Sequence, residues 1–204
     1  PHLNPETIIT DAGSVKGAIV DQATDLWANF VGGHPMAGNS ESGISAFEKG
    51  LFAHRPYVLT PTDKTSPAAL EQVAELVGTL NCIIDRATPA EHDLAVAWIS
   101  HLPMAISANL INACIHEKNP QILNLAKKFA STGFKDTSRV GAGNPEMGRM
   151  MAEYNRDALL RSLYGYRDQL DVLINSIETK QWAEIQDLLS QNQSARNNFL
   201  NPKD

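Results

Sequence analysis

Strand-like and helical patterns alternate along the first part of this 204-residue chain, and only helical patterns follow. Four short apolar runs predict strands, at residues 7–10, 30–33, 57–59 and 82–85. Amphipathic stretches at residues 15–29 and 67–80 predict helices between them. Such alternation is typical of a mostly parallel sheet with helices on its faces. We expect an α/β domain over residues 1–87 and an all-α domain over residues 88–204.

The second half opens on a clear helix start. Thr88 can cap the helix, Pro89 suits its first position and Glu91 completes a capping box. This helix is expected to reach about residue 116. Residues 94–115 are apolar almost all round, which predicts burial on most sides, in a bundle or a dimer.

The remaining pattern predicts more helices and two loops. Helices are expected over residues 120–130, 145–179 and 182–199. A polar loop is expected at residues 39–49. Residues 131–144, rich in glycine and small polar residues, predict one irregular stretch within the helical half.

Charge and cysteine content narrow the choice of partners. The formal net charge is −6, and the 17 basic residues are scattered, so nucleic acid and anionic membranes are poor partners. Cys82 and Cys114 lie in apolar runs without ligand spacing, which indicates buried free thiols in a reducing compartment and no metal. With no run near 20 apolar residues and no signal peptide before the first strand, we expect a cytoplasmic protein.

The chain carries no complete nucleotide site. It has no G-x-G-x-x-G, because the nearest string, residues 141–148, has the wrong spacing and follows no strand. The sequence reads instead like the second half of such a site. Since the chain opens on Pro1 and is in a strand by about Thr7, we expect a further segment upstream.

Two strand ends deliver polar side chains to what looks like one cleft. Residues 32–38 (GGHPMAG) form a glycine-rich turn that would hold His34 in a loop where a ligand can approach, although the histidine could be structural. Residues 8–16 repeat this pattern, with an apolar strand, a small polar turn and a helix start. There Ser14 could bond a ligand or cap the helix expected to begin at Val15.

The helical half offers further candidates. Residues 133–139 (GFKDTSR) gather cations, an anion and hydroxyls, and Arg139 could grip a carboxylate or phosphate. Alternatively, Asp136 and Arg139 pair with each other as helical neighbours. His92 and His101 read first as core or interface histidines.

These motifs resemble one known family. Residues 11–16 (DAGSVK), 32–38, 100–103 (SHLP) and 133–139 are similar, in order, to the prephenate/arogenate dehydrogenases of tyrosine biosynthesis. Residues 97–103 (AWISHLP) are most similar to the cyanobacterial arogenate dehydrogenases. The resemblance covers roughly residues 5–150. It implies an α/β plus all-α fold, a partial Rossmann-type domain followed by a helical dimerisation domain.

The resemblance also implies a reaction, the oxidative decarboxylation of a cyclohexadienol with hydride transfer to NADP or NAD. His34 would take the proton of the ring hydroxyl, and Ser14 would bond that hydroxyl and orient the imidazole. Arg139 would hold the ring carboxylate with Asp136 as its ion-pair partner, and His101 would also bind substrate. A free imidazole pKa near 6.5 suits such a base.

The cofactor side and the substrate follow from the same resemblance. Cofactor-binding residues would be Asp11, Ser14, Met36 and Gly133. Met104 stands where prephenate-preferring relatives often carry a second histidine, and it cannot donate a hydrogen bond, which favours arogenate. Gly148 stands where some relatives have tryptophan. Alternatives are a prephenate dehydrogenase forming 4-hydroxyphenylpyruvate, an inactive dimerising fragment, and another dehydrogenase acting on a hydroxy acid.

Overall fold

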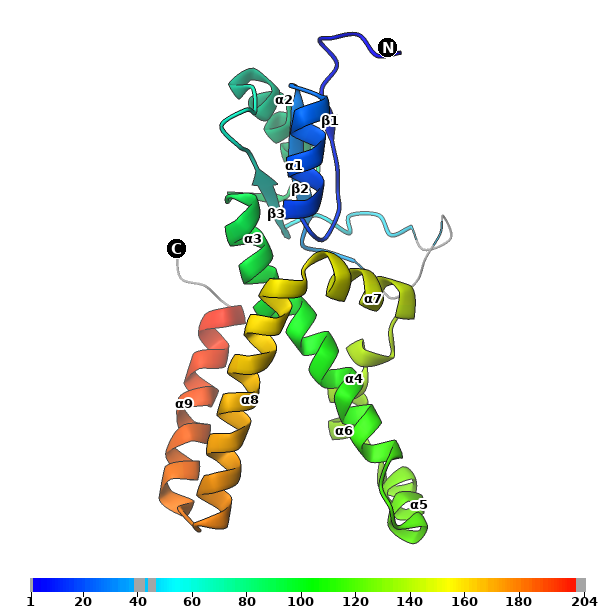
Figure 1. Ribbon diagram of the computed structural model, residues 1–204, viewed down its shortest axis with the longest axis vertical. Helices are drawn as coiled ribbons and strands as arrows, with labels where there is room; N and C mark the ends of the chain where they lie inside the picture. The colour runs from blue at the N-terminus through cyan, green and yellow to red at the C-terminus, as the bar shows by residue number, and fades with distance from the viewer. Residues whose placement is uncertain (1, 39–42, 44–46, 201–204) are drawn as a thin grey trace. The chain divides into compact units, whose positions relative to one another are not determined.

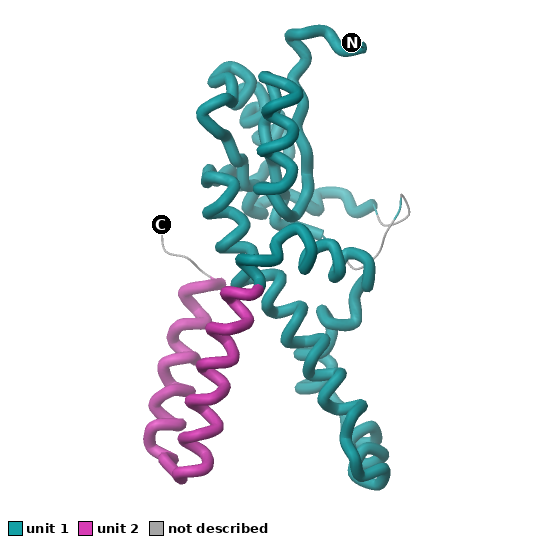
Figure 2. Tube along the Cα trace, viewed as in Figure 1, with its two compact units in different colours: residues 1–159 teal, residues 160–204 magenta. Residues whose placement is uncertain are grey.

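The computed structural model describes residues 2–38, 43 and 47–200 (Figure 1). The loop expected at residues 39–49 lies largely outside them. The chain forms two compact units, residues 1–159 and 160–204 (Figure 2). The division expected after residue 87 falls inside the first unit and stays a prediction.

The described strands form one four-stranded sheet in the order β1-β2-β3-β4. They are β1 Ile9–Thr10, β2 Phe30–Pro35, β3 Pro56–Thr60 and β4 Ile83–Arg86. The outer pairings, β1 with β2 and β3 with β4, are parallel, as expected. The middle pairing is antiparallel, so the sheet is mixed. No helical crossover is needed between β2 and β3, because antiparallel neighbours can be joined directly.

Each parallel pair is joined by one helix. Helix α1, Gly17–Leu26, follows β1, and α2, Pro67–Gly78, follows β3. Both contact β2. The core lies where α2 covers the sheet, and its buried members are Val31, Tyr57, Leu59, Ala69, Val73 and Val77. Cys82 and Cys114 are free, as expected, but only half-buried.

Helix α1 is shorter than residues 15–29 because its end residues are engaged elsewhere. Trp27 is extended, and its indole N–H donates to the Thr7 carbonyl at 2.7 Å. At the other end, Lys16 precedes the first helical residue. The apolar periodicity therefore located the helix but placed both of its ends too far out.

The capping box is confirmed, and it begins a long helical run. The Thr88 hydroxyl accepts the Glu91 N–H at 3.2 Å, and the Glu91 carboxylate accepts the Thr88 N–H at 3.0 Å. Helix α3, Pro89–Val96, passes through a π-helical turn, Ala97–His101, into α4, Leu102–Ile115. Pro103 has no N–H for the preceding turn, which fits a change of helical pitch here.

Within the single chain this run is not buried on most sides, and its burial in a dimer stays a prediction. Leu94, Trp98, Ile99 and Ile115 are between 37% and 55% exposed. By length and composition, Pro89–Ile115 could cross a membrane, since its mean hydropathy is 1.5 over the best window. Core helices share these properties, and the run buries the polar residues His92 and His101 within the first unit.

The stretch expected to be irregular is largely helical. After α5, Pro120–Phe129, which matches its prediction, residues 131–144 contain α6, Thr132–Ser138, and a 3₁₀ turn, Val140–Ala142. The buried Ser107 on α4 holds both, because its hydroxyl donates to the Thr137 carbonyl at 2.8 Å and accepts the Gly141 N–H at 2.7 Å. Tertiary contacts therefore outweigh weak helix propensity.

The helix expected over residues 145–179 breaks at Asn155. Helix α7, Pro145–Tyr154, ends just before this residue, and α8, Arg156–Glu178, begins just after it. Asn155 has φ −115° and ψ 36°. Helix α9, Trp182–Leu200, confirms the last prediction. The turn between α8 and α9 places Lys180 in the left-handed region.

Candidate active site

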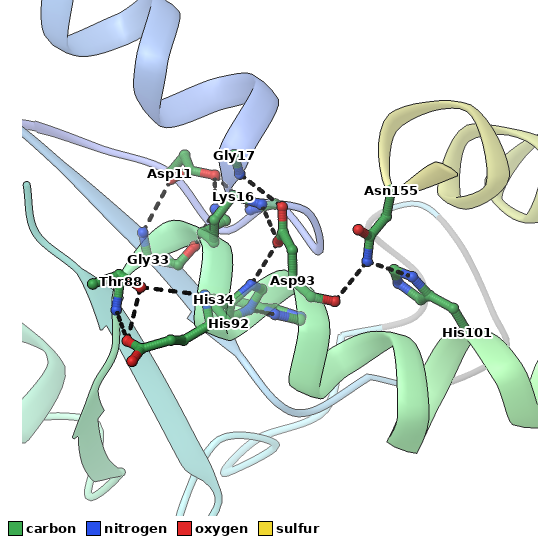
Figure 3. Close-up of polar contacts among 12 residues, drawn as sticks. Asp11, Lys16, Gly17, Gly33, His34, Thr88, His92, Asp93, His101 and Asn155 are labelled. Carbon is green, nitrogen blue, oxygen red and sulfur yellow. Dashed lines mark hydrogen bonds and ion pairs between the residues drawn. The ribbon is translucent and has the colours of Figure 1, made fainter. Parts of the chain in front are cut away.

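The ends of β1 and β2 are tied together by a buried ion pair (Figure 3). The Asp11 carboxylate pairs with Lys16 and accepts the Gly13 N–H at 2.8 Å and the Gly33 N–H at 3.0 Å. The Lys16 ammonium also donates to the Gly33 carbonyl at 2.7 Å. Burial lowers the pKa of Lys16, and the bond to Asp11 opposes this. The two predicted strand ends therefore lie next to each other.

Close approach explains why position 33 is glycine. A Cβ there would lie 2.8 Å from the Asp11 carbonyl oxygen and 2.9 Å from the Tyr57 ring. Both distances are shorter than real Cβ contacts. Gly33 therefore permits the packing of β2, and it leaves His34 at a fixed place in the strand.

His34 lies within β2 and not in a loop, contrary to the prediction. The strand extends through Pro35 because residues 32–35 pair with β3, where His34 faces Val58. His34 as a whole residue is 9% exposed. Its Nδ1 lies 2.8 Å from Nε2 of His92, and the two rings meet edge to face.

The environment of His34 keeps the ring neutral. Burial, followed by the nearby His92 and Lys16, lowers its pKa from 6.5 to about 4. The expected value near 6.5 is therefore too high for this structure. A neutral ring at pH 7 has a free lone pair, so His34 can accept a proton from a ligand.

Asp93 links His92 to the start of α1. Its carboxylate accepts the backbone N–H groups of Lys16 and Gly17, each at 2.8 Å, and lies 2.8 Å from Nδ1 of His92. It thereby caps α1 from another helix, where a helix N-terminus favours negative charge. Burial alone would raise the pKa of Asp93, but the bonds from His92 and the two N–H groups outweigh burial and lower it.

Ser14 therefore does not cap α1, and it does not contact His34 by a hydrogen bond. Its half-buried hydroxyl has no hydrogen-bond partner among the described residues. Ser14 lines a cavity of about 720 Å³, together with residues of α1 and α7 such as Ile19, Met147 and Tyr154. This cavity is largely apolar, and the Ser14 hydroxyl is one of the few polar groups that line it.

Arg139 and Asp136 are both exposed, and no ion pair joins them. Within the part of the chain that the structure describes, Arg139 makes no hydrogen bond or ion pair. Gly133 is exposed on α6, with nothing within 4 Å of a Cβ at that position. These residues are not brought into contact with His34, and the ion-pair interpretation of Asp136 is wrong.

His101 is fully buried, and only one of its two ring nitrogens has a hydrogen-bond partner among the described atoms. The Asn155 side-chain N–H₂ donates to its Nδ1 at 3.2 Å and to the Asp93 carbonyl at 2.8 Å. Nε2 has no partner among the described atoms. Since Nδ1 accepts, Nε2 carries the proton, and a buried N–H without an acceptor marks a place for a ligand group or a water. Burial lowers the pKa of His101.

The backbone of Met36 is hydrogen-bonded to the sheet, since its N–H donates to the Pro56 carbonyl at 2.9 Å. Its half-buried side chain lines a separate, mostly polar pocket with Ala37, Leu51 and Arg55. Across residues 2–38, 43 and 47–200, no group of three histidine, cysteine or acidic residues could hold a metal ion.

Sequence reasoning missed the partners of the central histidine. His92 and Asp93 were visible as an adjacent pair, but 58 residues separate His92 from His34. Lys16 was read only as part of a motif, and Asn155 was placed inside a helix. Only the packing of α3 against the strand ends brings these residues together.

The class of protein follows from comparison of the whole chain with known families. Residues 1–85 match the family model described as the nucleotide-binding domain of prephenate dehydrogenase. Residues 88–191 match the model described as its dimerization domain. The chain therefore belongs to the prephenate dehydrogenase family.

Individual relatives agree with this assignment. The chain is 36% identical to prephenate dehydrogenase of Bacillus subtilis over 179 residues, which are 86% of this chain and 48% of that protein. It is 29% identical to cyclohexadienyl dehydrogenase of Zymomonas mobilis, over 96% of this chain and 67% of that protein. The chain thus spans about half the length of its first curated relative.

Solved structures with the same fold include enzymes of both names. The chain is similar to Synechocystis arogenate dehydrogenase at 52% identity and a TM-score of 0.89, covering 98% of this chain and 72% of that one. It is also similar to prephenate dehydrogenase from Aquifex aeolicus, solved in complex with hydroxyphenyl propionate and NAD+, at 29% identity and a TM-score of 0.91. That match covers 97% of this chain and 68% of the other.

The residues present fit a nicotinamide cofactor only in part. The Ser14 hydroxyl is half-buried, unpartnered among the described residues and placed at the rim that follows β1. A hydroxyl can donate to and accept from the amide of a nicotinamide. The chain has no G-x-G-x-x-G loop for the diphosphate. The fit therefore concerns the reactive end of the cofactor.

Proposed function

We propose that the full-length protein oxidises and decarboxylates arogenate to tyrosine with NADP or NAD as the hydride acceptor. The observation that carries the proposal is His34, a buried neutral imidazole at the rim of the nucleotide-binding half of a prephenate dehydrogenase family chain. When bound, the nicotinamide supplies the acceptor for hydride from C4 of the substrate ring. Loss of CO2 from C1 then makes the ring aromatic.

His34 is proposed to take the proton of the ring 4-hydroxyl as the hydride leaves. A low pKa keeps nearly all of the ring in the basic form at pH 7. Ser14 is proposed to bond the same hydroxyl or the nicotinamide amide, because its own hydroxyl is free of partners in the described chain.

Arg139 is proposed to hold the ring carboxylate, and His101 to donate its Nε2–H to a substrate oxygen. Both groups have unused donors in the described structure. A guanidinium matches a carboxylate in geometry. Too strong a grip on the departing carboxylate would stabilise the ground state, so we expect positioning to be the main contribution of Arg139. Asp136 lies on α6, which ends just before Arg139, and it is proposed to support this site.

The cofactor side is proposed to include Asp11, Ser14, Met36 and Gly133. The Asp11 carboxylate is occupied by Lys16 and two backbone N–H groups, so its contribution would be to hold the rim in shape. Residues 1–87 and 88–204 are proposed as the nucleotide-binding part and the substrate and dimerisation part.

The preference for arogenate rests on Met104. Its sulfur lies 3.6 Å from the place of a Cβ on Gly148, so the two unusual residues are neighbours. The thioether cannot donate a hydrogen bond to the keto-acid side chain of prephenate. A larger residue at position 148 would compete with Met104 for the same space. The similarity to an arogenate dehydrogenase agrees with this preference.

The protein is also proposed to be a cytoplasmic homodimer that assembles through the helical part. The match to a dimerization domain and the exposed apolar side chains of α3 and the π-helical turn, Leu94, Trp98 and Ile99, support this. Exposed apolar surface of this kind marks an interaction site.

The experiment compares His34→Asn with the parent in the full-length protein. We expect kcat to fall at least about 100-fold with little change in KM, because asparagine keeps a polar group but cannot take the proton. His116→Asn, at an exposed histidine of the same protein, should leave kcat unchanged. Unchanged turnover in His34→Asn would refute the base assignment.

Arg139→Ala tests the substrate anchor. We expect a KM for arogenate that rises about tenfold or more, because the carboxylate loses its charged partner. Arg149→Ala, which removes an exposed arginine paired with Glu153 on α7, is the control. A normal KM in Arg139→Ala would show that the arginine has no part in binding.

A second candidate is a dimerising fragment without cofactor binding, favoured by the missing glycine-rich loop. Calorimetric titration of the 204-residue chain with NADP+ and NAD+ separates the two. Saturable micromolar binding would exclude the fragment.

A further inference from the structure

Three buried side chains form a continuous line that ends at His34 (Figure 3). Asp93 Oδ1 lies 2.8 Å from His92 Nδ1, and His92 Nε2 lies 2.8 Å from His34 Nδ1. His92 is 2% exposed, and the other two are 9% exposed. Every nitrogen of His92 is therefore used, one towards the carboxylate and one towards His34.

Proton positions along this line follow from its acidic end. Asp93 accepts two backbone N–H groups at the start of α1, which favour the ionised carboxylate. An ionised carboxylate only accepts hydrogen bonds, so Nδ1 of His92 must donate to it. With that proton as the only one on the His92 ring, Nε2 accepts, and among the described groups the donor to it is Nδ1–H of His34. The remaining lone pair of His34 is on Nε2.

We propose that His92, held by Asp93, is a positioning residue that fixes His34 in the Nδ1–H tautomer and presents Nε2 as the proton acceptor. This inference rests on the proposed function for its chemical meaning. In that reaction the O–H bond of the ring hydroxyl breaks and an N–H bond forms at Nε2. The resulting imidazolium donates Nδ1–H to His92, and the Asp93 carboxylate stabilises the charge.

The tautomer matters because free imidazoles favour the other form. With Nε2–H, His34 would present a donor where the reaction needs an acceptor. The remaining charged or titratable groups that act on His34 are Lys16, Asp11 and His101. The Lys16 ammonium and Asp11 carboxylate are paired with each other, so no described group besides His92 bonds Nδ1 and fixes the tautomer.

Helix α3 positions the line. The capping box at Thr88 sets the start of the helix, and the adjacent residues His92 and Asp93 then point to different partners. Asp93 reaches the N-terminus of α1, while His92 reaches β2. Asn155 donates to the Asp93 backbone carbonyl at 2.8 Å and so supports the same turn.

The first test reads the tautomer without substrate or cofactor. In the 204-residue chain labelled with ¹⁵N-histidine, long-range ¹H–¹⁵N spectra at neutral pH report which nitrogen of each ring carries the proton. We expect the Nδ1–H pattern for His34. An Nε2–H pattern in the parent chain would overturn the proposal without the need for any variant.

Variants then ask whether His92 is the cause. His92→Leu removes the acceptor and should return His34 to the Nε2–H form. His92→Gln places an amide oxygen near the lost Nε2 and should keep Nδ1–H, since that oxygen can accept. His116→Leu, at an exposed histidine, is the matched control and should change nothing. An unaltered His34 tautomer in a folded His92→Leu protein would refute the role of His92.

The second test is catalytic and uses the full-length protein. His92→Leu should lower kcat for arogenate by about tenfold or more with little change in KM, and His92→Gln should recover much of the loss. A purely structural role would give equal losses in both variants. If the parent oxidises neither arogenate nor prephenate, the proposed function fails, whereas the tautomer result still decides the inference about His92.

Discussion

At the scale of single residues, the site is defined by buried polar groups that share partners. His34 contacts His92, Asp93 serves both His92 and the start of α1, and Lys16 joins Asp11 to Gly33. Buried ionisable groups are stable only when they are paired or neutral. Lys16 and Asp11 are paired, and His34 is neutral. Protonation of the site must therefore affect folding.

We expect the chain to lose stability in mild acid. The folded-state pKa of His34 is about 4 and its ordinary value is 6.5, so between these values the unfolded chain binds more protons. The free energy of unfolding is then unaffected by this group above pH 6.5 and falls as the pH drops towards 4, by no more than about 3 kcal/mol. The lowered pKa of His101 acts in the same pH range, whereas the lowered pKa of Asp93 acts in the same direction only below its ordinary value of 3.8.

Urea unfolding followed by circular dichroism at several pH values measures this effect. His34→Asn should flatten the dependence between pH 6.5 and 4, and the exposed-site variant His116→Asn should not. Equal slopes for the parent and His34→Asn would contradict the lowered pKa of His34.

Individual site residues were only partly predictable from the sequence. His34 and Ser14 were singled out because each follows an apolar run at a glycine-rich strand end. The sequence could not place His92 against His34, because contacts across 58 residues depend on packing. Helical spacing and the family resemblance both suggested that Asp136 pairs with Arg139, whereas both side chains are exposed and no ion pair joins them.

At the scale of elements, contacts between helices decide where several of them begin and end. Helix α1 receives its N-terminal cap from Asp93 on α3, and α6 with its 3₁₀ turn is held by Ser107 on α4. Gly141 comes so close to α4 that a Cβ would lie 2.2 Å from the Ala108 nitrogen. This approach places residues 132–142 along α4.

Gly141→Ala is expected to destabilise the chain by about 1–3 kcal/mol, because the added methyl must push the turn away from the α4 backbone. Gly133→Ala is the matched control, since nothing lies within 4 Å of its Cβ position and alanine favours helix. Thermal unfolding of the two variants checks the difference. A Gly141→Ala protein as stable as Gly133→Ala would show that the close packing is unimportant.

Element type was predictable where local signals were strong. The capping box at Thr88 and the prolines at residues 89, 120 and 145 marked helix starts correctly. The glycine-rich stretch 131–144 was misread as irregular because its helix depends on Ser107. The antiparallel middle of the sheet was also missed, since the apolar pattern of a strand does not state its direction.

At the scale of the molecule, the two family matches divide the chain into a nucleotide-binding part and a dimerization part. Large apolar side chains are exposed along the helical part, among them Trp98, Ile99, Ile177 and Trp182. The same apolar run that predicted a buried helix therefore remains uncovered in one chain. A second copy is the proposed cover.

Ile99→Asp is expected to weaken or abolish the dimer, because a carboxylate would be buried in an apolar interface. Ile99 is 55% exposed, and Leu76 on α2 is 56% exposed, so Leu76→Asp is a closely matched control. Sedimentation equilibrium of the parent and both variants gives the dissociation constants. A monomeric parent, or equal weakening in both variants, would argue against an interface on this helix.

We propose that this chain forms the substrate side of an arogenate dehydrogenase with His34 as its base. The most direct measurement follows reduced nicotinamide and identifies the product when the full-length protein and its His34→Asn variant receive arogenate or prephenate with NADP+ or NAD+. We predict tyrosine and CO2 from arogenate, a higher kcat/KM for arogenate than for prephenate, and little turnover by the variant. Turnover of neither compound, or equal turnover by the variant, would contradict the claim.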